Sequence, residues 1–288
     1  MKNTTTEEKK PTAKPTTHPT EHNGMEESVL TRNLPTAKPV MSYHHTTGKN
    51  EDYKRLIGLP EWLFPTVCDR KDQSKLTVTE QQRIICAFNM INNDGTLGKL
   101  VDIHEEMHMQ HTDDRLLPWH RVFIYLFEEA LHQYHPDVCL PYWDWTKPAG
   151  QNIPVWLAGV TPVVQTPTRT LTVSRAPGSS ASLASIASGV ATANSQTTYS
   201  SFGSLVNGIH GSVHMWVGGT MSDITESPAD ILFWMHHANL DRLWWKWYNS
   251  PQGQGKNPPL TGADAVMDPW AFTETQIRQI STLHYQYV

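Results

Sequence analysis

Apolar residues recur at helical spacing in the first half of the chain. Residues 77–80 read T-V-T-E, a capping-box pattern, and the apolar positions after them predict a helix that ends near Asn93. A second helix is expected over residues 96–110. Pro118 suits the first turn of a third helix, where a missing N–H costs nothing, and this helix is expected to end near Tyr134.

The second half contains two more predicted helices around a segment of different composition. Residues 205–216 predict a fourth helix, and Ser227-Pro228 opens a fifth that continues to about Tyr248. The fifth is apolar nearly all round, which is typical of a buried, central helix. Residues 145–203 are rich in Ser, Thr, Ala, Pro and Gly, and predict long loops with a small two-stranded element. The fold class is mainly α, with a single domain and little β.

The N-terminal segment differs from the rest. Residues 1–40 are rich in Thr, Lys, Pro and Glu, and such a segment cannot bury enough apolar surface to offset its ordering entropy. We expect a flexible tail there, with His18 and His22 in solvent, and an ordered domain over residues 41–288. The first ten residues lack an apolar core, so no secretory signal is visible and the cytoplasm is the default compartment.

Charge and cysteine content exclude several classes of protein. A formal net charge of -5 gives no electrostatic case for binding nucleic acid or an anionic membrane. No stretch approaches the roughly 20 apolar residues of a membrane span. Cys68, Cys86 and Cys139 form an odd set without a C-x-x-C pattern, and we expect free buried thiols.

Histidine is unusually clustered along the chain. Of the 15 histidines, many fall in two bursts between His104 and His237. In the second burst, His210 and His214 are four residues apart, which on a helix places both imidazoles on one face, about 5–6 Å apart at Cβ. They could hold one metal ion together with His237 of the buried fifth helix. The alternative is that they are ordinary core histidines. It is the less favoured interpretation, because each of the three would then need its own polar partner.

The first burst offers another all-imidazole site. His104, His108 and His111 have the spacing of one helical face, and His120 follows at the next helix start, which gives four candidates for three positions. Sites made only of imidazoles suit copper, zinc or iron, and two such sites in one domain indicate a binuclear centre. His104 to His108 also matches the H-E-x-x-H pattern of zinc proteases, but that interpretation leaves the second burst unexplained.

Four motifs in order resemble those of a known family. They are R-L-L-P-W-H-R, L-P-Y-W-D-W, H-G-S-V-H-M-W-V-G-G and S-P-A-D-I-L-F-W-M-H-H-A-N-L-D. Over residues 76–248 the chain resembles the type-3 copper proteins, which comprise tyrosinases, catechol oxidases and haemocyanins. Met109 stands where fungal and plant members carry a cysteine bridged to a histidine, so the chain looks more like the bacterial members.

The resemblance implies a central four-helix bundle around two copper ions. One copper would be held by His104, His111 and His120, with His108 as the rival of His104, and the other by His210, His214 and His237. His236 would support these ligands without binding copper. Asp241 would anchor the last helix, to an arginine, and so orient the site.

The resemblance also implies an activity, the oxidation of small phenols by O2. Catechols would give o-quinones, and monophenols would be hydroxylated at the ortho position. Gly211 stands where strong phenol hydroxylases have Asn, and residues 145–222 contain no Asp or Glu, so we expect catechol oxidation to exceed monophenol hydroxylation. An o-aminophenol oxidase and a haemocyanin-like O2 carrier are the alternatives. The sequence leaves open a copper-delivery partner and the oligomeric state.

Overall fold

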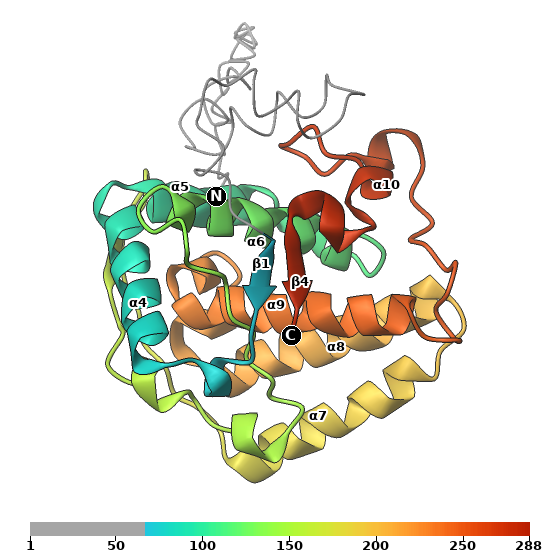
Figure 1. The fold of residues 1–288 in the computed structure, drawn as a ribbon, viewed down its shortest axis with the longest axis horizontal. Helices are drawn as coiled ribbons and strands as arrows, with labels where there is room; N and C mark the ends of the chain where they lie inside the picture. Colours follow the sequence, from blue (N-terminus) through green and yellow to red (C-terminus); the bar gives the residue numbers. More distant parts are fainter. Residues whose placement is uncertain (1–66) are drawn as a thin grey trace, which may run out of the picture.

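The computed structural model describes residues 67–288, and Figure 1 shows their arrangement. The tail predicted for residues 1–40, with His18 and His22, lies outside the described residues. The same holds for the expected start of the domain at residue 41, and both remain predictions. In the part of the chain described here, no helix is long and apolar enough to cross a membrane.

Four helices form the centre of the fold. They are α5 (Thr96–Glu106), α6 (Leu116–His132), α8 (Tyr199–Val217) and α9 (Ile231–Tyr248), and α9 runs through the middle of the molecule (Figure 1). Helix α9 is buried along most of its length, as its nearly uniform apolar sequence predicts. It packs on α6, where the rings of Phe127 and Trp234 stack with centroids 3.9 Å apart. The predicted mainly α domain with a central four-helix bundle is confirmed.

The capping box at the first helix is formed. Thr77 accepts a hydrogen bond from the backbone N–H of Glu80, and the Glu80 carboxylate accepts from the backbone N–H of Thr77. The helix that follows, α4 (Val78–Asn93), ends at the predicted residue and packs against α5 and α6. Local sequence signals therefore placed this helix correctly at both ends.

The segment predicted to be long loops contains a helix, α7 (Ser180–Asn194), and this part of the prediction was wrong. Ser179 caps it by accepting from the N–H of Ser182, and the buried positions Leu183, Ala187 and Val190 form one stripe against α8. The stripe has helical spacing, but half of the helix's buried positions are alanines and serines surround it, so the apolar signal was weak. Helix α7 lies along the outer side of α8 (Figure 1).

The strands are few and short. Antiparallel β2 (Val163–Gln165) and β3 (Thr170–Thr172) form the small element that the sequence predicted. Strand β1 (Cys68–Arg70) pairs in parallel with β4 (Tyr285–Tyr287), which brings the two ends of the described chain together. The remaining elements are short helical turns: η2 (Gln73–Lys75), η3 (His108–His111), η4 (Pro148–Gly150), η5 (Val155–Leu157), η6 (Gly219–Ser222), η7 (Ser227–Ala229), η8 (Gly262–Ala265), α10 (Glu274–Ile277) and η9 (Ile280–Leu283).

The cysteines do not behave as expected from the sequence. Cys68 and Cys139 form a disulfide with Cα atoms 5.5 Å apart, and Cys86 is a free, exposed cysteine. The prediction of free buried thiols was therefore wrong. The two paired residues are 71 positions apart and meet because β1 lies beside the segment that follows α6, a contact that no local pattern in the sequence encodes.

Candidate metal centre

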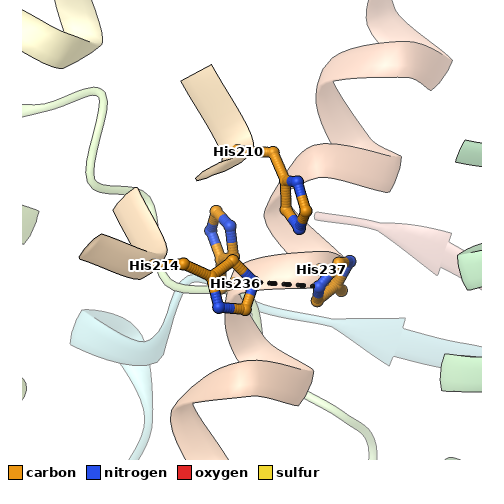
Figure 2. Close-up of side chains that lie close together, drawn as sticks. All are labelled: His210, His214, His236 and His237. Atoms are coloured by element: carbon orange, nitrogen blue, oxygen red, sulfur yellow. Dashed lines mark hydrogen bonds between the residues drawn. The ribbon is translucent and has the colours of Figure 1, made fainter. Parts of the chain in front are cut away.

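The histidines gather into two groups inside the four-helix bundle. The first cluster consists of His104, His111 and His120, and the second cluster of His210, His214, His236 and His237. Within each cluster the candidate ligand atoms lie within 4.8 Å of one another. Figure 2 shows how the four imidazoles of the second cluster converge from α8 and α9.

Three separate elements supply the first cluster. His104 lies in the last turn of α5, His111 in η3 and His120 in the first turns of α6. The Nε2 atom of His104 is 3.1 Å from Nε2 of His111 and 3.4 Å from Nε2 of His120. The expected helix over residues 96–110 ends at Glu106, so the prediction that His104, His108 and His111 share one helical face was wrong, although His104 and His111 still meet.

His108 does not belong to the first cluster. Its side chain is exposed, and its Nδ1 lies 3.2 Å from the backbone carbonyl of Glu105. Because the chain changes from α5 to the tighter turn η3 just before His108, the helical spacing that would have aligned it with His104 is lost. Of the four candidates in this part of the sequence, the fold brings together the other three.

A pair of helices builds the second cluster. His210 and His214 lie one turn apart on α8, as their spacing predicts, and Nε2 of His214 is 3.3 Å from Nε2 of His237 on α9 (Figure 2). His236 is held differently, because its Nδ1 accepts a hydrogen bond from the indole N–H of Trp145 at 3.0 Å. The His236 ring stacks parallel to that of His210, with centroids 5.6 Å apart.

The two clusters face each other. The rings of His120 and His237 are stacked with centroids 4.0 Å apart and an interplanar angle of 8°, and those of His111 and His210 are 6.1 Å apart. Segments about a hundred residues apart in the sequence therefore converge on one site. Two ions bound in the two clusters would be close neighbours.

Backbone carbonyls orient most of these imidazoles. The Nδ1 atoms of four rings lie 2.7–3.0 Å from carbonyl oxygens: His104 from Ile224, His111 from His108, His120 from Leu116 and His214 from Met221. A carbonyl only accepts, so each Nδ1 carries the proton and each Nε2 is left with a lone pair directed into its cluster. Such hydrogen bonds fix the tautomer and the orientation of metal-binding histidines.

Burial keeps these imidazoles neutral. It lowers the pKa values of His104, His120 and His237 well below the ordinary value, and the neighbouring histidines lower them further. Burial likewise lowers the pKa of His214 to about 4. Each lone pair is therefore available to a metal ion at neutral pH without the loss of a proton.

The donor set fits soft or borderline transition metals. The Nε2 atoms of His104 and His111 are 3.1 Å apart and direct their lone pairs at each other. Because no proton lies between them, the two lone pairs repel unless both bind the same cation. Nε2 of His210 is buried and has no hydrogen-bond partner among the described residues, which a metal ion would remedy. Neither cluster contains a thiolate or a carboxylate, and ligands made only of imidazole suit copper.

Asp241 ties α9 to α6 beside the site. Its carboxylate accepts from Nε of Arg121 at 2.5 Å and from the hydroxyls of Tyr285 and Tyr287 at 2.6 Å each. Arg121 follows His120 directly, and Asp241 lies one turn after His237. The ion pair therefore joins α6 and α9, the helices that carry the stacked rings of His120 and His237. Arg121 is the arginine that was expected to pair with Asp241.

Two residues that contact the clusters were missed by sequence reasoning. Trp145 belongs to a motif noted in the sequence, yet nothing there indicated that its N–H reaches His236. Asn207 contacts residues of both clusters, and an asparagine three positions before a histidine is not a distinctive pattern. The contacts of Trp145 with His236 and of Asn207 with His111 each join two different elements, so they depend on packing that the local sequence does not encode.

Comparisons with known proteins agree with the copper chemistry. The sequence model of the family described as Tyrosinase, the common central domain of tyrosinase, matches residues 95–172 and 165–250, which together span 156 of the 288 residues. The tyrosinase of Streptomyces antibioticus is 28% identical over an alignment that covers 76% of this chain and 98% of that protein. Hemocyanin A-type, units Ode to Odg, of Enteroctopus dofleini is 26% identical over 65% of this chain.

Solved structures have the same fold. A functional unit of octopus haemocyanin superimposes with a TM-score of 0.64 at 22% identity, covering 76% of this chain and 68% of that one. Latent apple tyrosinase gives a TM-score of 0.58 at 17% identity, covering 78% of this chain and 63% of that one. The family model matches more than half of the residues of this chain, so the chain belongs to the tyrosinase family. It is a copper-dependent oxidoreductase of tyrosinase type, with a binuclear copper centre.

Proposed function

We propose that this protein oxidises catechols to o-quinones with O2, at two copper ions held by His104, His111 and His120 and by His210, His214 and His237. The observation that carries the proposal is the close approach of the two clusters, with the rings of His120 and His237 4.0 Å apart. Two catechols release four electrons and four protons, which reduce one O2 to two molecules of water, so no further oxidant is needed. When bound, the copper ions supply the electron transfer between catechol and O2.

The protein supplies a rigid, neutral set of nitrogen atoms. Carbonyls hold the Nδ1–H of several ligands in place, so little rearrangement is needed when the charge of the bound metals changes. The apolar ring of Phe233 lies between the clusters, with its centroid 4.2 Å from that of His237 and 5.0 Å from that of His104. It excludes water from the inner side of the site.

The substrate would approach from the other side. His111 and His214 are only half-buried, whereas His104, His120 and His237 are buried. Gly211, between His210 and His214, is half-buried, and a Cβ added there would meet nothing within 4 Å. No side chain at position 211 therefore obstructs the approach of an aromatic ring to the half-buried imidazoles.

Gly211 also bears on which phenols react. A catechol that reaches the site needs only to lose electrons and protons, whereas a monophenol must first be deprotonated and then hydroxylated. Gly211 has no side chain that could take up the proton or hold a water molecule to do so. We therefore propose that catechol oxidation is faster than monophenol hydroxylation.

The test begins with copper loading of the purified protein. We expect two copper ions per chain by elemental analysis, and O2 consumption with formation of o-quinone when a catechol such as dopa is added. Reversible O2 uptake without quinone would instead indicate a carrier, and faster turnover of an o-aminophenol than of a catechol would indicate the aminophenol oxidase. Zinc in place of copper would contradict the proposal.

Assays of tyrosine and dopa in parallel test the preference. We expect a slower rate with tyrosine, and a higher ratio of tyrosine to dopa turnover in Gly211→Asn, for which there is space on α8. Gly208→Asn, on the same helix and equally free of nearby atoms, is the matched control and should leave the ratio unchanged. Equal rates with tyrosine and dopa in the unaltered protein would refute the preference.

A further inference from the structure

Asn207 contacts residues of both histidine clusters. It lies on α8 one turn before His210, and its Oδ1 is 3.4 Å from Nδ1 of His210 in the second cluster. Its amide nitrogen donates to the backbone carbonyl of His111 in the first cluster, at 3.1 Å, and to the carboxylate of Asp113, at 2.8 Å. One half-buried side chain therefore connects a histidine of one cluster with the turn that carries a histidine of the other.

The partners of Asn207 determine which way its amide points. A carbonyl and a carboxylate only accept hydrogen bonds, so the NH2 group must face His111 and Asp113. The amide oxygen must then face His210. Because that oxygen only accepts, Nδ1 of His210 carries the proton and Nε2 keeps its lone pair, in the orientation that a metal ligand needs.

His210 differs in this respect from other imidazoles of the two clusters. His104, His120 and His214 direct their Nδ1 atoms at backbone carbonyls, which no substitution can remove. His210 depends on a side chain instead. Its Nε2 is buried without a hydrogen-bond partner among the described residues, so a change of tautomer would place a proton on the atom that faces the metal.

We propose that Asn207 is a positioning residue for both halves of the copper centre: it fixes the tautomer of His210 and ties η3, which carries His111, to α8. Asp113 orients Asn207 and acts through it. The inference rests on the proposed function only in so far as both clusters hold copper. The tautomer of His210 can be measured without any metal.

Two variants separate the two contacts. Asn207→Leu has a similar shape and removes both the acceptor for His210 and the donor to His111. In the double variant Asn207→Asp with Asp113→Asn, a carboxylate at position 207 still accepts from His210, and the amide at position 113 donates to it. The pair keeps one negative charge but loses the hydrogen bond to the His111 carbonyl. Asn207→Ala gives the same expectation as Asn207→Leu should the leucine prevent folding.

The first measurement is imidazole ¹⁵N NMR of the full-length protein before copper is added. We expect His210 to be the Nδ1–H tautomer in the unaltered protein and in the double variant, and to lose this preference in Asn207→Leu. The second measurement is the affinity for copper, by competition with a chelator. One of the two copper ions should bind about 10–100-fold more weakly in Asn207→Leu, as is typical when a group that orients a ligand is removed.

The double variant should recover most of this affinity, because the acceptor for His210 is restored. Ser200→Ala removes a comparable exposed contact from the same helix to Asp114, without touching a histidine, and should change neither measurement. If Asn207→Leu leaves the His210 tautomer and both copper affinities unchanged, the inference is wrong and the proposed function stands. If the unaltered protein binds no copper, the proposed function fails, whatever the tautomer.

Discussion

The two histidine clusters are built in different ways. In the second cluster, His210 and His214 lie on one helix at a fixed spacing, and His237 comes from the helix packed against it. In the first cluster, three short stretches of chain each supply one histidine, and one of them is the turn η3. A helix that has formed already holds its ligands at about the right distance, whereas the first cluster requires α5 to end, turn and meet α6 in a particular geometry.

This difference extends to the contacts around each cluster. His111 is half-buried and its ring is held by the carbonyl of His108 within the same turn. His237 is buried on α9, the most enclosed helix of the bundle. The rings are also oriented differently: all three imidazoles of the first cluster direct Nδ1 at backbone carbonyls, whereas His210 of the second depends on the side chain of Asn207.

Loss of a proposed ligand should have the largest effect. His214→Ala and His111→Ala should each reduce the copper content from two ions per chain to one and lower catechol oxidation by more than about 100-fold, since a ligand matters more than a group that orients it. Elemental analysis and O2 consumption measure both. Retention of two copper ions in either variant would mean that the ligand set is wrong.

Loss of the ion pair between Arg121 on α6 and Asp241 on α9 should lower the free energy of unfolding more than loss of an exposed ion pair. Asp241→Ala leaves Arg121 buried without its carboxylate, and loss of one partner of a buried ion pair costs about 3–5 kcal/mol. Urea unfolding of the metal-free protein measures this loss. Asp137→Ala is the control, because its ion pair with Arg83 is exposed and should contribute less than about 1 kcal/mol. Equal losses in the two variants would contradict the importance of the buried pair.

His236 tests which member of the adjacent pair binds copper. Its Nδ1 accepts from Trp145, so we expect His236→Ala to keep two copper ions and to lower activity about 10–100-fold through displaced neighbours. Trp145→Phe, which removes only the N–H, should have a smaller effect in the same direction. A loss of one copper ion in His236→Ala, with two retained in His237→Ala, would reverse the assignment.

The metal-free protein should lose stability in mild acid. The pKa of His214 is lowered by burial to about 4 in the folded state, from an ordinary value of 6.5. Between these values the unfolded chain binds a proton that the folded chain does not, so stability decreases as the pH falls from 6.5 to about 4. The buried histidines of both clusters act in the same direction. Thermal unfolding at pH 7 and pH 5 should show a lower Tm at pH 5, and copper should reduce the difference. A Tm that is higher at pH 5 would contradict the prediction.

The smallest effect is expected at His108. Because its side chain is exposed and lies outside the first cluster, His108→Ala should retain two copper ions and change catechol oxidation by less than about 2-fold, within the usual range for a surface substitution. His104→Ala, its matched partner, should lose one copper ion. The opposite result would place His108 in the site.

Several features of the fold could be predicted from the sequence because their signals are local. The capping box at Thr77, the apolar fifth helix and the spacing of His210 and His214 depend on residues within a few positions of one another. Helix α7 was missed because alanines fill part of its buried stripe and serines surround it, which weakens the apolar pattern. The helix over residues 96–110 was predicted too long, since the apolar pattern continues into a turn that packing against α6 produces.

The sequence by itself determined the mainly α class, the two groups of histidines and the kind of metal that imidazole favours. Tertiary structure decided that His104 and not His108 joins His111 and His120, that Cys68 pairs with Cys139, and that Asn207 contacts residues of both clusters. The physical reason is one of range. A helical turn places residues three or four positions apart by local hydrogen bonding, whereas these contacts join elements whose relative positions are set by the packing of the whole core.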